Sequence, residues 1–458
     1  MRVATAYFVS IVSLALMTGP VAAQSASYVQ VNTNSLGNDI IGDAANEPSI
    51  AVDPTNPNRM AIGWRQFDTI TNNFRQAGVA YTTNGGLTWT SSVLTPGLFR
   101  SDPVLDSDAD GNFYYSSLSS VTKAEVFKSI NGGATWGPPI NSYGGDKQWL
   151  AVDRTNGPGR GNIYQHWNVQ FSNVTDTSFT RSTNGGASYD FPTTGPNPFS
   201  KWGTMDVGPN GTLYIAGAAL NTNNGHLFAK STNAQNVGQT PTFTTQSISL
   251  GGTTATGGVN PAGLLGQVSI ATDHSFTSKR GNIYVLGSVN PVGTDPLDVM
   301  FIRSTDDGQT WSAPIKINDN PLGEDSYQWF GTMAVAPNGR IDVVYNDTGV
   351  AANNALSVLN YAYSWDGGLT WLGNMALTAP FNHSLGYPSQ NKLGDYYDMV
   401  SDNFGASLAF SATFTGGQDV YYMRINAVPE PGAAALLLSA CLALVFARRR
   451  SRSILLAN

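Results

Sequence analysis

The chain has 458 residues, of which 12% are charged, with 49 glycines and 24 prolines. This low charge and high turn content is typical of an all-β extracellular protein and not of a helical one. Setting aside five arginines in the two end segments leaves 19 basic against 31 acidic residues, about −12, which disfavours DNA, RNA and anionic lipid as partners. The only cysteine is Cys441, so the body has no disulfide and no thiol nucleophile.

Residues 1–23 are predicted to be a secretory signal peptide. Arg2 precedes an apolar stretch, 3–17, and the small-residue pattern Val21-Ala22-Ala23 follows before Gln24. That order of charged, apolar and small residues indicates export and cleavage after Ala23. A membrane-spanning helix is the alternative, but it would need roughly 20 apolar residues. The mature body is therefore expected to cover residues 24–426.

One octet recurs along the body. It reads Ser/Thr-x-Asp/Asn-x-Gly-x-Thr-Trp, with small variations, and its copies begin at Thr82, Ser129, Ser182, Ser304 and Ser364, with a decayed copy from Ser231. The Asp or Asn side chain can accept backbone N–H groups of its own turn, glycine supplies positive φ, and the Trp packs the turn onto a sheet. We interpret the octets as hairpin turns that stabilise the fold, and not as catalytic sites.

A second unit recurs between the octets, consisting of an apolar strand, a turn and another apolar strand. Six of its seven copies precede an octet, which predicts four strands per unit. The seventh has only a third strand, 420–425, and the alternating segment 27–32 is predicted to supply its outer strand. Closure of this kind leaves no free sheet edge and favours seven blades over six. The copies begin at Pro48, Pro103, Gln148, Gly203, Val268, Gly331 and Tyr396.

The octet is that of the Asp-box, or BNR, repeat, and the body resembles the sialidase-like superfamily from about Asn46 to Arg424. The resemblance implies an all-β propeller of four-stranded blades and a glycoside hydrolase, exo-α-sialidase-like, acting on an extracellular polysaccharide or glycoconjugate. Sialidases also imply an F/Y-R-I-P segment early in the chain. The nearest segment, Phe99-Arg100-Ser101-Asp102-Pro103, lacks the Ile-Pro and follows the first octet instead of preceding it. A non-catalytic glycan- or protein-binding surface module is therefore the alternative.

The C-terminal segment, 427–458, has the features of a sorting signal. Val428-Pro429-Glu430-Pro431 precedes an apolar run, 433–447, and an arginine cluster follows at 448–452. The order resembles the PEP-CTERM signal of Gram-negative bacteria, which implies processing by an exosortase, transient contact of the apolar helix with the inner membrane, and release or attachment at the surface. A plain C-terminal anchor is the alternative, with the arginines on the cytoplasmic side.

Candidate site residues lie where the innermost strands begin, because these starts gather at one mouth of a propeller channel. They form a carboxylate-rich funnel in which crowding could raise one pKa for general-acid work. The alternative is that each acid caps a turn. The proposed catalytic residues are Glu324, Asp325, Tyr327, Asp395 and Asp102, with Arg65 as a substrate clamp. Further residues at these starts are Glu47, Asp146, Lys147, Lys201 and Tyr396.

No cofactor is expected, with calcium as the alternative at one loop. Asp106, Asp108 and Asp110 alternate before Gly111, like the start of a calcium loop. Position twelve would be Ser117 and not a bidentate Glu, and the parallel loops indicate an ordinary hairpin turn. The four histidines are scattered without the spacing of a metal site.

Overall fold

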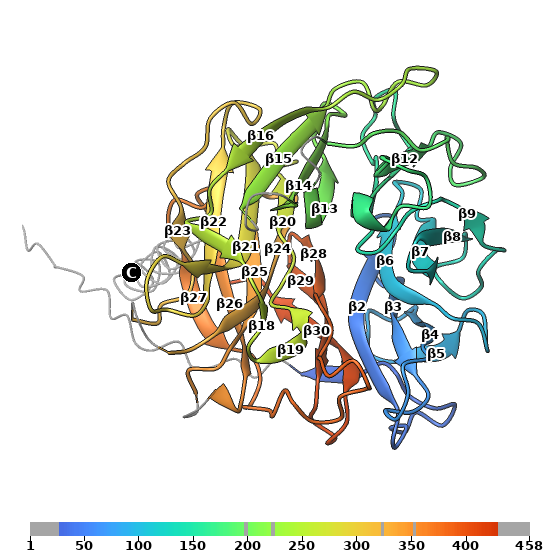
Figure 1. The fold of residues 1–458 in the computed structure, drawn as a ribbon, viewed down its shortest axis with the longest axis vertical. Coiled ribbons are helices and arrows are strands. Elements are labelled where there is room, and N and C mark those ends of the chain that lie inside the picture. Colours follow the sequence, from blue (N-terminus) through green and yellow to red (C-terminus); the bar gives the residue numbers. More distant parts are fainter. Residues whose placement is uncertain (1–26, 197–199, 221–224, 322–324, 351–353, 429–458) are drawn as a thin grey trace, which may run out of the picture.

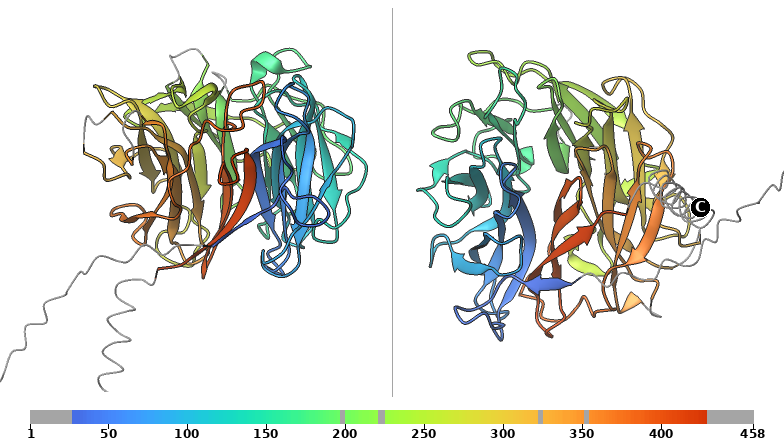
Figure 2. Two further views of the ribbon diagram at one scale, coloured as in Figure 1. Left: turned by 90° about the horizontal axis from the view of Figure 1, so that it is seen from below. Right: turned by 180° about the vertical axis from the view of Figure 1, so that it is seen from behind.

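Seven antiparallel sheets surround a central channel in the computed structural model, which describes residues 27–196, 200–220, 225–321, 325–350 and 354–428 (Figure 1). The chain passes from one blade to the next, so that blue, green, yellow and red blades follow one another around the ring. Figure 2 shows the same ring from behind and the upright blades from below. The all-β, seven-bladed propeller predicted from the repeats is confirmed.

The first four blades come from the N-terminal half. Their strands are β2 (Ala44–Val52), β3 (Met60–Phe67), β4 (Gln76–Thr82) and β5 (Thr90–Val93); β6 (Ser101–Ser107), β7 (Phe113–Ser120), β8 (Lys123–Ser129) and β9 (Ile140–Asn141); β10 (Trp149–Val152), β11 (Ile163–His166) and β12 (Phe179–Ser182); and β13 (Ser200–Val207), β14 (Leu213–Ala219), β15 (His226–Ser231) and β16 (Thr244–Ile248). A short 3-10 helix, η1 (Val169–Phe171), follows β11.

The last three blades complete the ring. Their strands are β20 (Ser269–Thr272), β21 (Ile283–Pro291), β22 (Asp298–Ser304) and β23 (Ile315–Lys316); β24 (Gln328–Val335), β25 (Ile341–Asp347), β26 (Val358–Ser364) and β27 (Leu372–Ala376); and β28 (Asp398–Asp402), β29 (Gly405–Ala412), β30 (Asp419–Asn426) and β1 (Tyr28–Gln30). An insertion before the fifth blade adds β17 (Gly252–Thr254), β18 (Thr256–Gly257) and β19 (Asn260–Leu264).

The ring closes through the N-terminal strand. β1 pairs antiparallel with β30, with Tyr28 opposite Met423 and Gln30 opposite Tyr421. In Figure 1 the short blue strand lies beside the red strands of the last blade. The buried Asn32 continues the contact by donating to Asp419 (2.8 Å) and accepting from the backbone N–H of Val420 (2.8 Å). The predicted outer strand of the seventh blade is therefore confirmed.

The third blade departs from the four-strand pattern. In the described part of the segment after β12, only an isolated bridge, between Phe179 and Thr193, lies where a fourth strand was expected. The segment after its octet reads Asp190-Phe-Pro-Thr-Thr-Gly-Pro196, and prolines cannot donate to a ladder. This segment therefore follows β12 for only a few residues.

Each octet forms the predicted Asp-box turn. In the fifth blade, Ser304 donates to Asp306 (2.8 Å), and Asp306 accepts from the backbone N–H and the hydroxyl of Thr310 (2.9 and 2.6 Å). The decayed copy keeps this function with a longer loop, since Asn233 accepts from the backbone N–H of Thr242 (2.9 Å). The turns are therefore stapled by their own side chains, as expected.

The boxes also join neighbouring blades. Gly308 has a positive φ of 76°, and a Cβ there would collide with the ring of Phe228 in the preceding blade. The half-buried Trp311 packs against the same ring, with centroids 5.1 Å apart. Gly368 and Trp371 contact Phe301 in the same way. The box is thus a clamp between blades as well as a turn.

Within the described residues, no helix is long and apolar enough to cross a membrane. The predicted signal peptide and the predicted sorting signal beyond residue 428 lie outside the described residues.

Candidate functional site

Two cavities lie along the channel, one at each end of the innermost strands, and they share no lining residue. The first, the funnel, has a volume of about 580 Å³ and lies where the innermost strands begin. Its lining includes Arg65, Arg75, Asp102, Asp146, Lys147, Lys201, Trp202, Lys392 and Asp395. The second, the channel cavity, has a volume of about 420 Å³ and lies further along the same strands.

The backbone places the funnel residues by an unusual conformation. Glu47, Asp102 and Lys147 have φ of 52°, 49° and 59°, the left-handed region that non-glycine residues rarely adopt. In the first two blades the strand register shifts at this residue. A bulge of this kind redirects one side chain out of the normal alternation. Backbone strain is therefore stored at the funnel, as it often is at functional sites.

The same position has positive φ in two further blades, the fourth and the sixth. The residues there are Trp202 and Phe330, with φ of 55° and 58°. In the fifth and seventh blades a nearby glycine has positive φ instead: Gly266 (136°) lies one residue before the aligned position and Gly394 (111°) two residues before it. Charged side chains occupy the bulge position in the first three blades, and an aromatic ring in the fourth and sixth.

The funnel charges form one connected network. Lys147 Nζ lies 3.0 Å from Asp102 and 2.5 Å from Asp395. Lys392 Nζ lies 2.5 Å from the same oxygen of Asp395 and 3.1 Å from Glu47, which is itself 3.2 Å from Arg65 Nε. All six side chains are largely buried, which makes such pairs costly to break.

This network fixes the ionisation of two predicted catalytic carboxylates. Burial alone would raise the pKa of Asp395, but Lys147 and Lys392 hold it well below its usual value. Burial is likewise outweighed at Asp102, where Lys147 and Arg65 lower the pKa. Both groups are therefore carboxylates at neutral pH and cannot donate a proton.

Two other funnel acids are shifted in the opposite direction. Burial raises the pKa of Glu47, although Arg65 and Lys392 oppose it, and its side chain is wholly inaccessible. Burial also raises the pKa of Asp146, with Asp102 and Asp395 adding repulsion and Lys147 opposing. Asp146 is only half-buried and lines the cavity. It is thus the accessible funnel acid with a raised pKa.

Two funnel cations have no carboxylate at ion-pairing distance among the described residues. Arg75 donates to Ser101 and Asn73 and stacks on Phe99, 4.7 Å from the ring centroid. Lys201 Nζ lies 3.8 Å from the ring centroid of Trp202. Burial lowers the pKa of both. They leave positive charge in the funnel that is not ion-paired with any carboxylate of the described residues.

The insertion before the fifth blade roofs one side of the funnel. Its hairpin, β18–β19, reaches the seventh blade, where Asn260 donates to the backbone oxygen of Gly394 (2.8 Å) and accepts from the N–H of Leu393 (2.9 Å). The N–H of Leu264 donates to Asp395 (2.9 Å). Asp395 is therefore a structural anchor for the hairpin as well as a member of the charge network.

The sequence-predicted site residues divide into two groups. Arg65, Asp102 and Asp395 meet in the funnel network, together with Glu47 and Lys147. Asp325 is exposed, and Tyr327 lies beside Gly258 on the insertion, so neither lines the funnel cavity. Glu324 lies outside the described residues. The assignment of a catalytic role to these residues stays a prediction.

Sequence reasoning missed Arg75, Lys392 and the roofing hairpin. Arg75 directly precedes β4, which is the third strand of its blade, and Lys392 lies three residues before Asp395. Neither residue is therefore at the start of an innermost strand, which is where site residues were predicted. The signal available in the sequence was that Arg75 and Lys392 each lie next to an apolar strand of the repeat.

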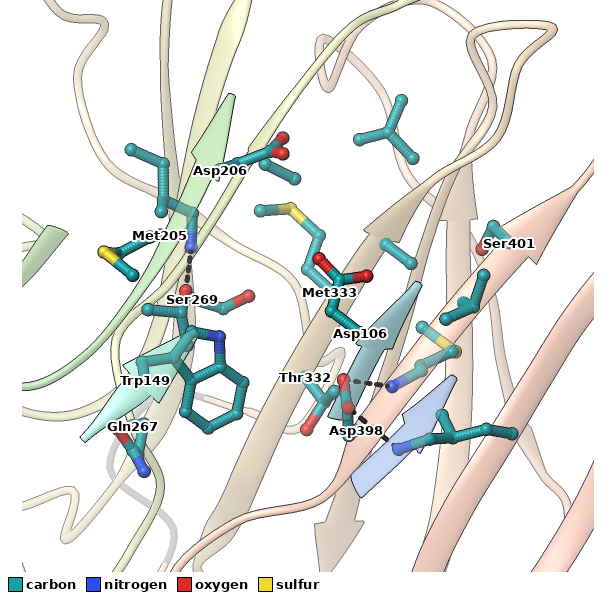
Figure 3. Close-up of a pocket in the computed structure, with 18 of the residues that line it drawn as sticks. Asp106, Trp149, Met205, Asp206, Gln267, Ser269, Thr332, Met333, Asp398 and Ser401 are labelled. Carbon is teal, nitrogen blue, oxygen red and sulfur yellow. Dashed lines mark hydrogen bonds between the residues drawn. The ribbon is translucent and has the colours of Figure 1, made fainter. Parts of the chain in front are cut away.

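The channel cavity contains three carboxylates that join neighbouring blades (Figure 3). Asp398 accepts from Ser49 (2.6 Å) and the N–H of Ile50 (3.0 Å), and Asp106 accepts from the N–H of Val152 (2.8 Å). Asp206 accepts from the N–H of Thr272 (2.7 Å). These carboxylates link three pairs of neighbouring innermost strands, β28 with β2, β6 with β10 and β13 with β20, which gives them a structural role.

The predicted calcium ligands do not fit a calcium site. Asp106 faces the channel and contacts Arg154, while Asp108 accepts from Asn112 and Tyr114 within its own hairpin. Asp110 is paired with Arg160 at 2.7 Å. The three side chains are engaged by different partners, and among the described residues no group of three His, Cys, Asp or Glu side chains is arranged to hold a metal ion.

Comparisons with known proteins give similarity of fold only. No protein-family model and no curated protein matches the sequence. Among solved structures, YCF48 bound to a D1 peptide is 14% identical, with 90% of this chain and 100% of that chain covered and a TM-score of 0.49. The endosialidase of phage phi92 is 9% identical, with 89% and 70% covered and a TM-score of 0.49.

A third solved structure, the sialidase of Trypanosoma rangeli in complex with the inhibitor DANA, is 11% identical. The match covers 88% of this chain and 60% of that chain, with a TM-score of 0.41. Similarity at this level says nothing about activity.

Proposed function

We propose that this chain is an exported propeller that binds an extracellular glycan in its funnel without cleaving it. The observation that carries the proposal is the charge network: Glu47, Asp102 and Asp395 each contact a lysine or arginine at 2.5 to 3.2 Å. A glycosidase needs one carboxyl group that keeps its proton and a second that faces the sugar. Carboxylates held by lysines supply neither.

The ligand is expected to carry carboxylate groups. Although the whole body is acidic, the funnel itself contains five cations against four acids, and Arg75 and Lys201 lack carboxylate partners among the described residues. The ring of Trp202 beside Lys201 offers a surface on which a sugar can stack. A polysaccharide with uronic acid units satisfies both features.

Binding to defined polysaccharides tests this proposal. The purified protein should bind polygalacturonate and not neutral dextran, and Lys201→Met should weaken that binding about tenfold, the loss of about 1.4 kcal/mol. Lys128→Met removes a lysine far from the funnel and should leave affinity unchanged. Equal binding of acidic and neutral polymers, or equal affinity of the two variants, would contradict the proposal.

Hydrolysis is the second candidate, and Asp146 is the observation that favours it. Its raised pKa would suit a general acid, with ionised Asp395 and Asp102 nearby. Chromogenic glycosides, including uronides and sialosides, provide the test. Turnover that falls at least a hundredfold in Asp146→Asn would establish a hydrolase, and no turnover on any of them supports the binding module.

Export and surface attachment complete the proposal. The signal at residues 1–23 would direct the body out of the cell, and the C-terminal segment would hold it to a membrane until an exosortase processes it. The envelope of a Gram-negative bacterium is the expected location. Fractionation of cells with and without residues 429–458 tests this: the truncated protein should move to the medium.

A further inference from the structure

The two ends of the propeller differ in what they carry. We call the end opposite the funnel the box face: it contains the Asp boxes and the turns of the inner hairpins. Contacts within it include the N–H of Gly85 with the oxygen of Asn58 (3.1 Å), and Lys279 Nζ with the oxygen of Trp365 (2.9 Å). Each contact joins a box to an inner hairpin turn, so the two kinds of turn form one surface.

The described chain leaves the propeller at the box face. β30 ends at Asn426, and the N–H of Ala427 donates to the oxygen of Phe404 (2.8 Å), which lies in the inner hairpin turn of the same blade. Asn403 beside it accepts from Asn338 in the corresponding turn of the sixth blade (3.5 Å). The described chain therefore ends, at Val428, on this face.

Only four residues, Pro429-Glu430-Pro431-Gly432, separate Val428 from the apolar run that begins at Ala433. Even fully extended, the five steps from residue 428 to residue 433 span at most about 18 Å. A lipid bilayer that holds the apolar run must therefore lie close to the box face. The innermost strand β24 is eight residues long, which places the funnel roughly 26 Å further away.

The box face has exposed apolar side chains, as a surface in contact with a lipid bilayer requires. Large apolar side chains project around it: Leu87 (75% exposed), Ile130 (75%), Phe276 (97%), Leu369 (58%) and Phe404 (81%). They come from the first, second, fifth, sixth and seventh blades. Arg280 stacks on Phe276, 5.3 Å from its centroid, and segments that lie on a membrane surface combine Phe and Leu side chains with Lys or Arg.

Exposed apolar side chains do not by themselves show which end of the propeller faces the lipid, since aliphatic residues such as Val292 are exposed at the opposite end. The position of Val428, on the box face, indicates which end it is. We propose that the box face is a lipid-facing surface that rests on the bilayer holding the C-terminal segment, so that the funnel opens away from the membrane. This inference rests on the proposed surface attachment and adds to it the orientation of the body and the surface that meets the lipid.

Site-directed fluorescence quenching tests the orientation. Cys441 is the only cysteine, so Cys441→Ser provides a background for single cysteines at Leu87 and Phe276, on separated blades of the box face, and at Phe171 on the funnel rim. Each full-length variant is labelled with an environment-sensitive dye and reconstituted with phosphatidylcholine vesicles that contain or lack a headgroup-quencher lipid. Its melting curve establishes that it is folded.

Flotation of the vesicles first measures attachment, and quenching then measures orientation. We expect the protein to float, the dyes at positions 87 and 276 to be quenched at least twofold, and the dye at 171 to be unaffected. Flotation with equal quenching at all three positions, or with quenching at 171 alone, would overturn the orientation and leave attachment standing. Failure to float would remove both.

Discussion

Lys147 holds together the charges at the funnel. Its Nζ contacts Asp102 and Asp395 at 3.0 and 2.5 Å, and its own backbone has a positive φ of 59°. Those two carboxylates raise its pKa well above the usual value, although burial opposes them. The lysine is therefore charged at every physiological pH, and it keeps two neighbouring carboxylates ionised.

Replacing Lys147 should lower the free energy of unfolding considerably. Lys147→Met leaves two buried carboxylates without their shared partner, and loss of one member of a buried ion network typically costs about 3 to 5 kcal/mol. Lys123→Met is the matched control, because that lysine pairs with Glu125 at 2.9 Å but is 40% exposed, and surface pairs contribute about 0 to 1 kcal/mol. Urea unfolding of both variants measures the difference. Similar losses would show that the funnel network contributes little to stability.

Asp398 provides the clearest pH dependence. Burial raises its pKa to about 7, against hydrogen bonds from Ser49 and the N–H groups of Ile50 and Met399. An acid whose pKa is higher in the folded protein stabilises the fold at low pH, and that stability is lost as pH rises from about 4 to about 7.

Asp398→Asn should remove this dependence. Because its side chain is partly open to the channel, we expect the variant to gain on the order of 1 to 3 kcal/mol over the wild type at pH 8 and nothing at pH 4. Thermal melts across this range measure it. A variant destabilised equally at both pH values would mean that the carboxylate acts through its hydrogen bonds alone.

The sequence allowed the position of these residues to be predicted, but not their ion pairs. Asp102, Asp395 and Lys147 could be placed at one mouth because strand starts converge in a propeller, whatever the loops do. Which charges neutralise one another could not be predicted, since Lys392 and Arg75 come from segments outside that pattern. Pairing decides whether a carboxylate can act as an acid, so function was less predictable than position.

At the scale of elements, the repeats were predictable because each is a local pattern. All seven inner hairpins and all the box turns follow from apolar alternation and turn residues within about 20 residues of sequence. The insertion β17–β19 was not predicted, because the segment 251–264 is rich in glycine and threonine and lacks that alternation. Its position is set by contacts with the seventh blade, which are long-range.

The box tryptophans should contribute stability without affecting ligand binding. Trp311→Ala removes a half-buried ring that packs against Phe228, and we expect a loss of about 2 to 4 kcal/mol, somewhat below that for a fully buried ring. Funnel affinity should not change, because the box lies on the opposite end. Leu369→Ala, at an exposed box position, is the control and should be neutral in chemical unfolding.

Asp306, in the same box, should matter through its hydrogen bonds. Those from Thr310 and Ser304 lower its pKa to about 2. A carboxyl group whose folded pKa is depressed stabilises the fold above its unfolded pKa, near 4, and loses that contribution as pH falls towards 2. The Asp306→Ala variant should therefore melt below the wild type at pH 7 and converge with it near pH 2. Lost ligand binding with an unchanged melting temperature would place function in the boxes.

At the scale of the whole molecule, closure depends on a very short strand. β1 contributes three residues, yet it completes the seventh blade and joins the first segment of the body to the last. Side chains reinforce the pairing of β1 with β30. Asn32 forms hydrogen bonds with both Asp419 and the backbone of Val420, and Gln30 also donates to Asp419 (3.0 Å). Nearly the entire body therefore lies within one loop closed by this contact.

Asn32→Ala should weaken the whole ring and not only the N-terminus. The change leaves the buried N–H of Val420 without its acceptor and removes one of the two donors to Asp419 Oδ1, which should cost about 1 to 3 kcal/mol. Asn34→Ala is the control, because Asn34 bonds only to the exposed turn that follows it. If closure is cooperative, Asn32→Ala should shift a single unfolding transition and speed hydrogen exchange in β2 and β28 as well as β30. Faster exchange confined to β30, with the melting temperature unchanged, would show that the ring holds without its N-terminal strand.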